Sequence, residues 1–240
     1  MRAREVAGRV AGLGLAPLVW VGGLLRRDRF FHPRGALYRA RAERLAEGGG
    51  AGRLAERLAG PVVARLSNAW WRGGRELPDV LGCALRFVEE DGSPSARDQD
   101  LLLATIRHPW TTLLAPLTTD QHDFLGNDYY AVSPFRMDAV GEGWLRLLGP
   151  GGSPDGPDRW SRLARAVEAG AARFELQLKL QGRWEPVIRI RLESPLEGEA
   201  RAARFHPFRA GRGLRPVGFV HALRPAAYGA SRRAVPLASR

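Results

Sequence analysis

The sequence predicts an α+β fold, in which a closed antiparallel β-barrel is accompanied by an N-terminal helical arm and a few short helices. Segments 173–180 and 187–192 alternate apolar and polar residues with a period of two, which is typical of half-buried strands. The 240 residues include 29 glycines and 17 prolines, which indicate many turns and argue against a helical bundle. Strand and helix patterns do not alternate, and closure of antiparallel strands removes exposed edges, so a barrel fits best.

The N-terminal helical arm is expected over residues 1–28, ahead of a barrel domain over 29–240. Residues 10–25 are apolar, but they are fewer than the roughly 20 residues that span a bilayer. The basic start resembles that of a signal peptide, yet Arg26 and Arg27 follow the apolar stretch where a small-residue cleavage site would stand. We therefore expect an arm packed on the barrel, with peripheral membrane contact through 10–25 as the alternative.

Two buried strands are predicted earlier in the chain, over 61–67 and 80–88, with turn signals between them. The second of these strands places alternate apolar residues on one face, namely Leu81, Cys83, Leu85 and Phe87.

A turn over 150–158 precedes a predicted helix, because the carboxylate of Asp158 can accept hydrogen bonds from the first helical turn. Gly170 ends this helix. Its apolar residues recur at helical spacing and are Trp160, Leu163, Ala164 and Val167. A last short helix is expected from Pro225, since proline suits the first turn.

The formal net charge of +12 comes almost wholly from arginines that are spread along the chain. Proteins that grip nucleic acid usually cluster their charge, so we expect only weak non-specific attraction to anions and no specific nucleic-acid partner. Cys83 is the only cysteine, which excludes an internal disulfide and a zinc site built from cysteines. A cytoplasmic location is the expectation, and the sequence leaves the oligomeric state open.

The five histidines lack the spacing of a helical metal site, and neither a nucleophile elbow nor a phosphate-binding glycine loop is present. His122 with Asp120 and Asp123 is a weak metal-site candidate, because polar loop residues usually face water. A hydrolase, including a phosphodiesterase, is therefore a less favoured alternative.

Six segments carry a more specific pattern. They are, in order, 29–36 (RFFHPRGA), 64–67 (ARLS), 79–87 (DVLGCALRF), 100–105 (DLLLAT), 129–136 (YYAVSPFR) and 205–208 (FHPF), the last followed by RPVG at 215–218. In order and spacing they resemble segments of the haem-dependent catalase superfamily, over roughly 29–236. The resemblance implies a catalase-like barrel, a haem cofactor, and hydrogen peroxide or an organic or lipid hydroperoxide as substrate.

The resemblance also implies roles for individual residues. His32 would be the distal base that accepts a proton from the peroxide and returns it to the leaving oxygen. Ser67 would orient His32, and Thr105 stands where the family has a distal asparagine. Arg29 and Arg65 would pair with the haem propionates, which suits forked cationic donors.

The proximal iron ligand is the main departure from the family, because the chain ends before the helix that carries the family's ligand tyrosine. Arg224 and Tyr228 repeat the R-x-x-x-Y spacing, which places both on one helical face. Tyr228 is thus the candidate iron ligand, with packing as its alternative role. Whether the chain is an active oxidoreductase or a haem-free barrel that binds an apolar ligand stays open.

Overall fold

The computed structural model describes residues 34–69, 71, 76–89, 95–108, 114–138, 140–196 and 205–217. The predicted arm over 1–28 and the predicted helix from Pro225 lie outside the described residues. The strands are β1 (Arg34–Arg44), β2 (Gly60–Asn68), β3 (Leu81–Phe87), β4 (Gln99–Ala104), β5 (Tyr129–Tyr130), β6 (Phe135–Met137), β7 (Gly141–Leu148), β8 (Arg173–Leu180), β9 (Arg183–Leu196) and β10 (Leu214–Pro216). The helices are α2 (Gly49–Leu58), α3 (Ala115–Thr118) and α4 (Arg159–Glu168).

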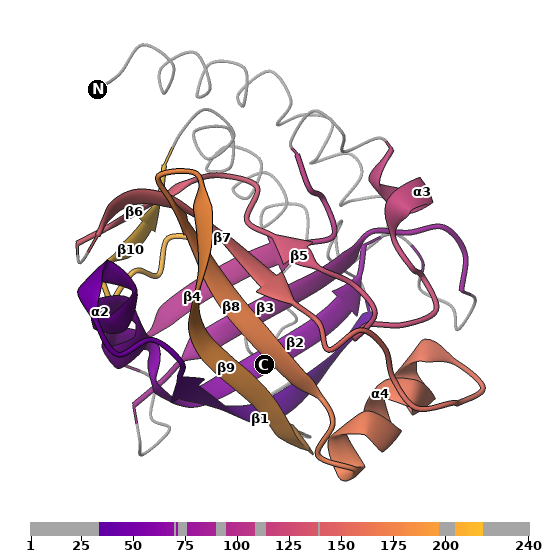
Figure 1. Ribbon diagram of the computed structural model, residues 1–240. Coiled ribbons are helices and arrows are strands. Elements are labelled where there is room, and N and C mark those ends of the chain that lie inside the picture. The colour runs from indigo at the N-terminus through magenta and orange to yellow at the C-terminus, as the bar shows by residue number, and fades with distance from the viewer. Residues whose placement is uncertain are drawn as a thin grey trace, which may run out of the picture.

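Eight antiparallel strands close into a barrel in the order β7–β5–β4–β3–β2–β1–β9–β8, because β8 pairs again with β7. The other two strands, β6 and β10, extend from β7 beside the barrel. Figure 1 shows β2, β3 and β4 side by side behind the crossing pair β8 and β9. The prediction of a closed antiparallel barrel is therefore confirmed for the described part of the chain.

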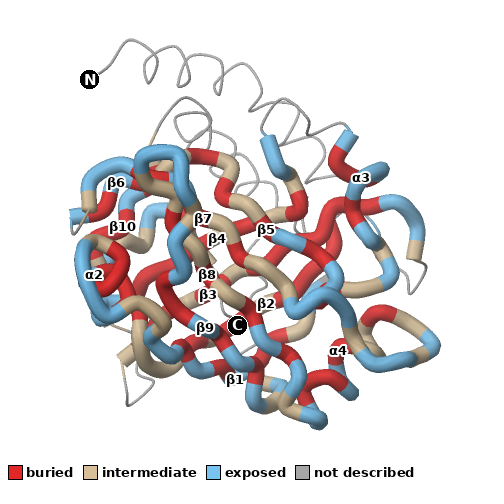
Figure 2. The backbone as a smooth tube through the Cα atoms, in the orientation of Figure 1, coloured by how far each residue is buried: buried red, intermediate tan, exposed pale blue. Residues whose placement is uncertain are grey.

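Apolar side chains fill the inside of the barrel, as the period-two patterns predict. The predicted face of 80–88 points inward, since Leu81, Leu85 and Phe87 are fully buried and Cys83 nearly so. Segment 173–180 coincides with β8, and 187–192 lies within the longer strand β9. Buried and more exposed positions alternate along the strands, and the outward faces of α2 and α4 are exposed (Figure 2).

Helix α4 begins and ends where the sequence predicts. The Asp158 carboxylate accepts hydrogen bonds from the amides of Trp160 and Ser161 at 2.8 and 3.0 Å. Gly170 follows the helix with a φ of 66°, a conformation that glycine adopts at little cost. Ala166 rather than Ala164 faces the core. The sequence patterns do not predict α2, because glycines at its start obscure its apolar face.

Three consecutive residues at the start of β4 hold the segment 205–217 against the barrel. The carboxylate of Asp98 accepts a hydrogen bond from Arg209, and Asp100 Oδ2 accepts one from the amide of His206 at 2.6 Å. Between them, the fully buried Gln99 carboxamide donates to the carbonyl oxygens of Arg209 and Leu214 and accepts from the Leu214 amide. Buried carboxamide bonds of this kind fix the position of the segment, because their loss leaves backbone groups unsatisfied.

We predict that Gln99→Leu lowers the free energy of unfolding by about 3 kcal/mol, since it leaves backbone groups of Leu214 and Arg209 without their partner. Urea denaturation measures the loss. Gln121→Leu, in a partly exposed loop, is the control and should change stability by less than about 0.5 kcal/mol. Equal losses in the two variants would show that the carboxamide does not hold the segment.

Candidate functional site

Two of the predicted site residues, Arg65 and Ser67, lie on the outer face of β2. They alternate with Ala64 and Leu66, which point into the barrel core. His32, Arg29 and Tyr228 lie outside the described residues, so their positions stay predictions. The described part of the candidate site is therefore formed by the strands around Ser67.

Directly paired positions on β1 to β5 place five residues in one row across the outer face. These residues are Gly35, Ser67, Gly82, Ala104 and Tyr130. The neighbouring row is formed by Leu37, Arg65, Ala84 and Leu102. We call these nine residues the small-residue face, because glycine, alanine and serine occupy most of its centre.

The small-residue face is shielded in part. Ser67 is 3% exposed and Leu37 is 6% exposed, although neither belongs to the barrel core. Ala84, Leu102 and Ala104 remain partly exposed. The Ser67 hydroxyl lies 3.5 Å from the carbonyl oxygen of Gly82, and a hydroxyl can rotate to another partner. The face thus offers a hydroxyl beside a largely apolar surface of small side chains.

Arg65 reaches along the edge of this face toward β1. A Cβ added to Gly35 would lie 2.7 Å from the guanidinium carbon of Arg65, so the arginine end would have to move if a larger residue replaced this glycine. Gly35 follows His32 by three residues in the chain. The structure therefore brings the Arg65 cation to the strand that continues from the predicted distal histidine.

Thr105 does not join Ser67 on the small-residue face. Ala104 occupies the row of Ser67, and the alternation of strand side chains directs the next residue to the opposite face. The Thr105 hydroxyl accepts a hydrogen bond from the Leu81 amide at 3.1 Å and lies 2.7 Å from the Thr119 hydroxyl. Thr105 thus ties the end of α3 to the barrel. The residue that pairs with Gly82, and so shares the row of Ser67, is Ala104. The sequence motif alone points instead to its last residue, Thr105.

Three of the segments quoted for the family resemblance meet at a buried ion pair beside this face. The Arg86 guanidinium binds both carboxylate oxygens of Asp100, at 2.7 and 2.8 Å. Burial lowers the pKa of Arg86, but the hydrogen bonds and charge of Asp100 outweigh it and raise the pKa overall. Asp100 also binds the amide of His206, and Arg86 lies 4.9 Å from the ring centre of Phe205. These contacts fix the relative positions of β3, β4 and segment 205–208.

Two of the described tyrosines do not suit the role of iron ligand, because their side chains lie in the apolar core of the barrel. Tyr38 and Tyr129 point into the barrel core, where burial raises the pKa of each phenol. The Tyr129 hydroxyl donates to the carbonyl oxygen of Phe124 at 2.8 Å. Tyr130 lies on the small-residue face, and burial together with the charge of Asp128 raises its pKa.

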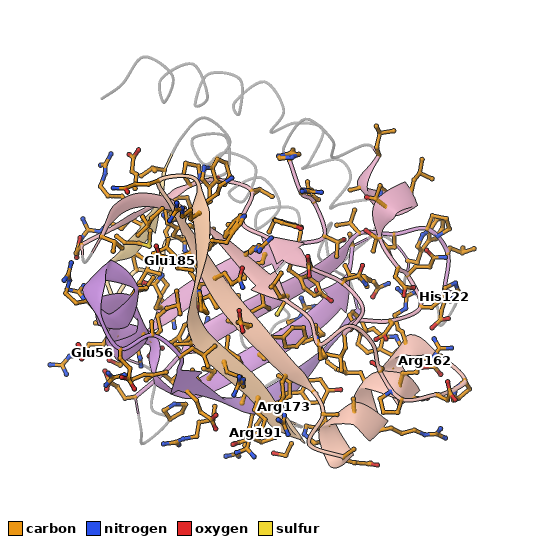
Figure 3. The ribbon with its side chains drawn as sticks, viewed as in Figure 1. Glu56, His122, Arg162, Arg173, Glu185 and Arg191 are labelled. Atoms are coloured by element: carbon orange, nitrogen blue, oxygen red, sulfur yellow. The ribbon has the colours of Figure 1, made fainter. Side chains whose placement is uncertain are left out.

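The loop histidine at 122 has a structural setting. Its Nδ1 lies 2.5 Å from Glu76 Oε2, and its carbonyl oxygen accepts a hydrogen bond from Arg162 at 2.7 Å. Figure 3 shows His122 and Arg162 on the same side of the molecule. The carboxylates of Asp120 and Asp123 accept hydrogen bonds from backbone amides of their own loop. His122 therefore joins this loop to α4 and to the segment that precedes β3.

Alkaline pH should destabilise the fold. Burial raises the pKa of the Tyr129 phenol and the Cys83 thiol above the values of 10.0 and 9.0 expected for exposed groups. The unfolded chain releases these protons first, so their contribution is intact below about pH 9 and is lost as the pH rises. We expect each group to cost about 1.4 kcal/mol per pH unit above its unfolded pKa.

Urea denaturation between pH 8 and pH 11 measures this loss, and Cys83→Ala should reduce its slope above pH 9. A free energy of unfolding that does not change over this range would contradict the buried positions of both groups.

Among the described residues, no group of three or more His, Cys, Asp and Glu side chains is arranged to hold a metal ion. In the same part of the chain, no helix has the length and apolar character required to cross a bilayer. A hollow of about 450 Å³ lies at the opposite end of β2 and β3, and its walls include Arg57, Arg212 and Asp138. No protein-family model matches the chain, and no curated protein is similar to it in sequence.

Proposed function

We propose that this protein is a catalase-related barrel that binds haem against the small-residue face and acts on hydrogen peroxide or an organic or lipid hydroperoxide. The observation that carries the proposal is the row of Gly35, Ser67, Gly82 and Ala104. Four segments that resemble the family, far apart in the chain, contribute one residue each to this row. The order of these segments along the chain does not by itself require that the four residues lie on one face of the barrel.

The residues present fit a planar, largely apolar group in three respects. The small side chains of glycine and alanine at the centre of the face would allow a flat ring to lie close to the backbone. The Arg65 guanidinium at its edge can pair with a carboxylate such as a haem propionate. The Ser67 hydroxyl can accept from or donate to an imidazole above the ring. Tyr228 is the proposed iron ligand.

His32 is the proposed general base. Its imidazole would accept the peroxide proton and return it to the departing oxygen, which needs a neutral ring at the start of the reaction. Ser67 would hold the ring by a hydrogen bond, and Arg29 would join Arg65 at the propionates. When bound, haem iron supplies the redox centre at which the oxygen–oxygen bond of the peroxide is broken. Thr105 has no part in this proposal, because its hydroxyl is engaged with Leu81 and Thr119.

Titration of the full chain with hemin tests the proposal. We expect a Soret band shifted from that of free hemin and a stoichiometry of about one. Ala84→Phe should weaken binding about a hundredfold, because overfilling a close contact costs roughly 3 kcal/mol. Glu185→Phe is the matched control, because Glu185 is exposed on β9, across the barrel from β3 and β4. This variant should bind hemin like the parent protein. Absence of a Soret shift would overturn the proposal.

Peroxide turnover separates the roles of individual residues. His32→Ala should abolish turnover and leave hemin bound, whereas Ser67→Ala should lower turnover about tenfold to a hundredfold through loss of orientation. Tyr228→Phe should change the ligand-field bands of the ferric protein if this tyrosine binds iron. Full turnover by His32→Ala would contradict the assigned base.

A haem-free function is the second candidate, favoured by the position of Tyr38 and Tyr129 in the barrel core, where neither can bind iron on the outer face. In that case the same face would bind an apolar ligand such as a lipid, because side chains fill the barrel interior. Native mass spectrometry of the purified protein distinguishes the two: a retained lipid without iron supports the second candidate. Retained haem supports the first.

A further inference from the structure

An arginine row crosses the outer face of the barrel wall formed by β1, β9 and β8. Arg41 pairs directly with Arg191, and Arg191 pairs directly with Arg173. All three residues are exposed. Figure 3 labels Arg173 and Arg191 close together at the lower side of the barrel, near β1. Adjacent strands are about 4.8 Å apart, so the Cα atoms of the three arginines span a strip about 10 Å wide.

The arginine row opposes the stability of the sheet, because like charges at directly paired positions repel. The next row on the same wall shows the favourable arrangement, in which Arg189 lies between Glu43 and Glu175. Neighbours offset the repulsion in part: Glu193 Oε1 lies 3.3 Å from Arg191, and Arg173 donates to the carbonyl oxygen of Gly170 at 2.9 Å. Three cations therefore occupy directly paired positions, with neighbouring groups that reduce their repulsion.

We propose that the arginine row is a contact surface for the anionic headgroups of a lipid bilayer. Guanidinium groups bind phosphate oxygens in a forked geometry, and exposed cations are attracted to anionic membranes. Each of the three row positions carries an arginine, so the row lacks the aromatic ring on which the bases of single-stranded nucleic acid commonly stack. The apolar sequence at 10–25 gives the chain a second membrane signal, and stable anchoring generally needs two.

Co-sedimentation of the full chain with vesicles tests this surface. Vesicles of phosphatidylcholine alone are compared with vesicles that contain phosphatidylglycerol as well. We expect binding to the anionic vesicles only, and we expect added salt to weaken it, since exposed charges are screened. Each basic residue near an anionic surface contributes about fivefold to the partition coefficient, so R191E should lower it about twenty-fivefold.

R97E is the matched control, because it makes the same change in net charge beside β4, which lies opposite β9 in the barrel. Its partition coefficient should stay within about twofold of the parent value, since β4 and β9 lie on opposite sides of the barrel and exposed charges are screened. An equal fall in R97E and R191E would show that net charge alone drives binding and would overturn the proposal. Tighter binding to duplex DNA than to anionic vesicles would overturn it as well.

Thermal unfolding shows that R191E is folded and tests the repulsion independently. R191E should raise the melting temperature, because a carboxylate between Arg41 and Arg173 restores alternating charge. R189E should lower it, because it places three carboxylates in the adjacent row. A lower melting temperature for R191E than for the parent protein would contradict the repulsion on which the proposal rests.

Discussion

The register between neighbouring strands is the constraint on which both proposed surfaces depend. Side chains alternate between the two faces of a strand, so a slip of one residue would move every side chain of that strand to the other face. The pairing of Ser67 with Gly82, and of Gly82 with Ala104, creates the small-residue face. The pairing of Arg191 with two other arginines creates the arginine row on β1, β9 and β8 in the same way.

Closure of the barrel and the segment 205–217 hold this register in place. Pairing of β7 with β8 closes the eight strands into a barrel, which restricts slippage. Residues 98–100 then bind segment 205–217 across the outside of the barrel, next to the Arg86–Asp100 ion pair. Burial of an ion pair carries a desolvation cost, and here the bidentate geometry and the His206 amide offset it. Most of the stability still comes from the apolar interior.

Much of the fold follows from the sequence, whereas little of the site does. Period-two patterns locate β8 and the inner face of β3, because a half-buried strand must alternate. They cannot tell which strands pair or in what register, so Thr105 was expected at a position that Ala104 occupies. The arginine row is invisible in the sequence for the same reason, since its members are separated by up to 150 positions. The three remaining predicted residues, Arg29, His32 and Tyr228, lie outside the described part.

Paramagnetic broadening of methyl resonances by bound ferric haem tests the central claim most directly, with the gallium porphyrin as the diamagnetic reference. If haem lies on the small-residue face, the methyl signals of Ala84, Leu102 and Ala104 should broaden most. Those of Val187 and Ile190 on β9, at the opposite wall of the barrel, should change little. Strongest broadening on β9, or equal broadening around the barrel, would contradict the placement of the site.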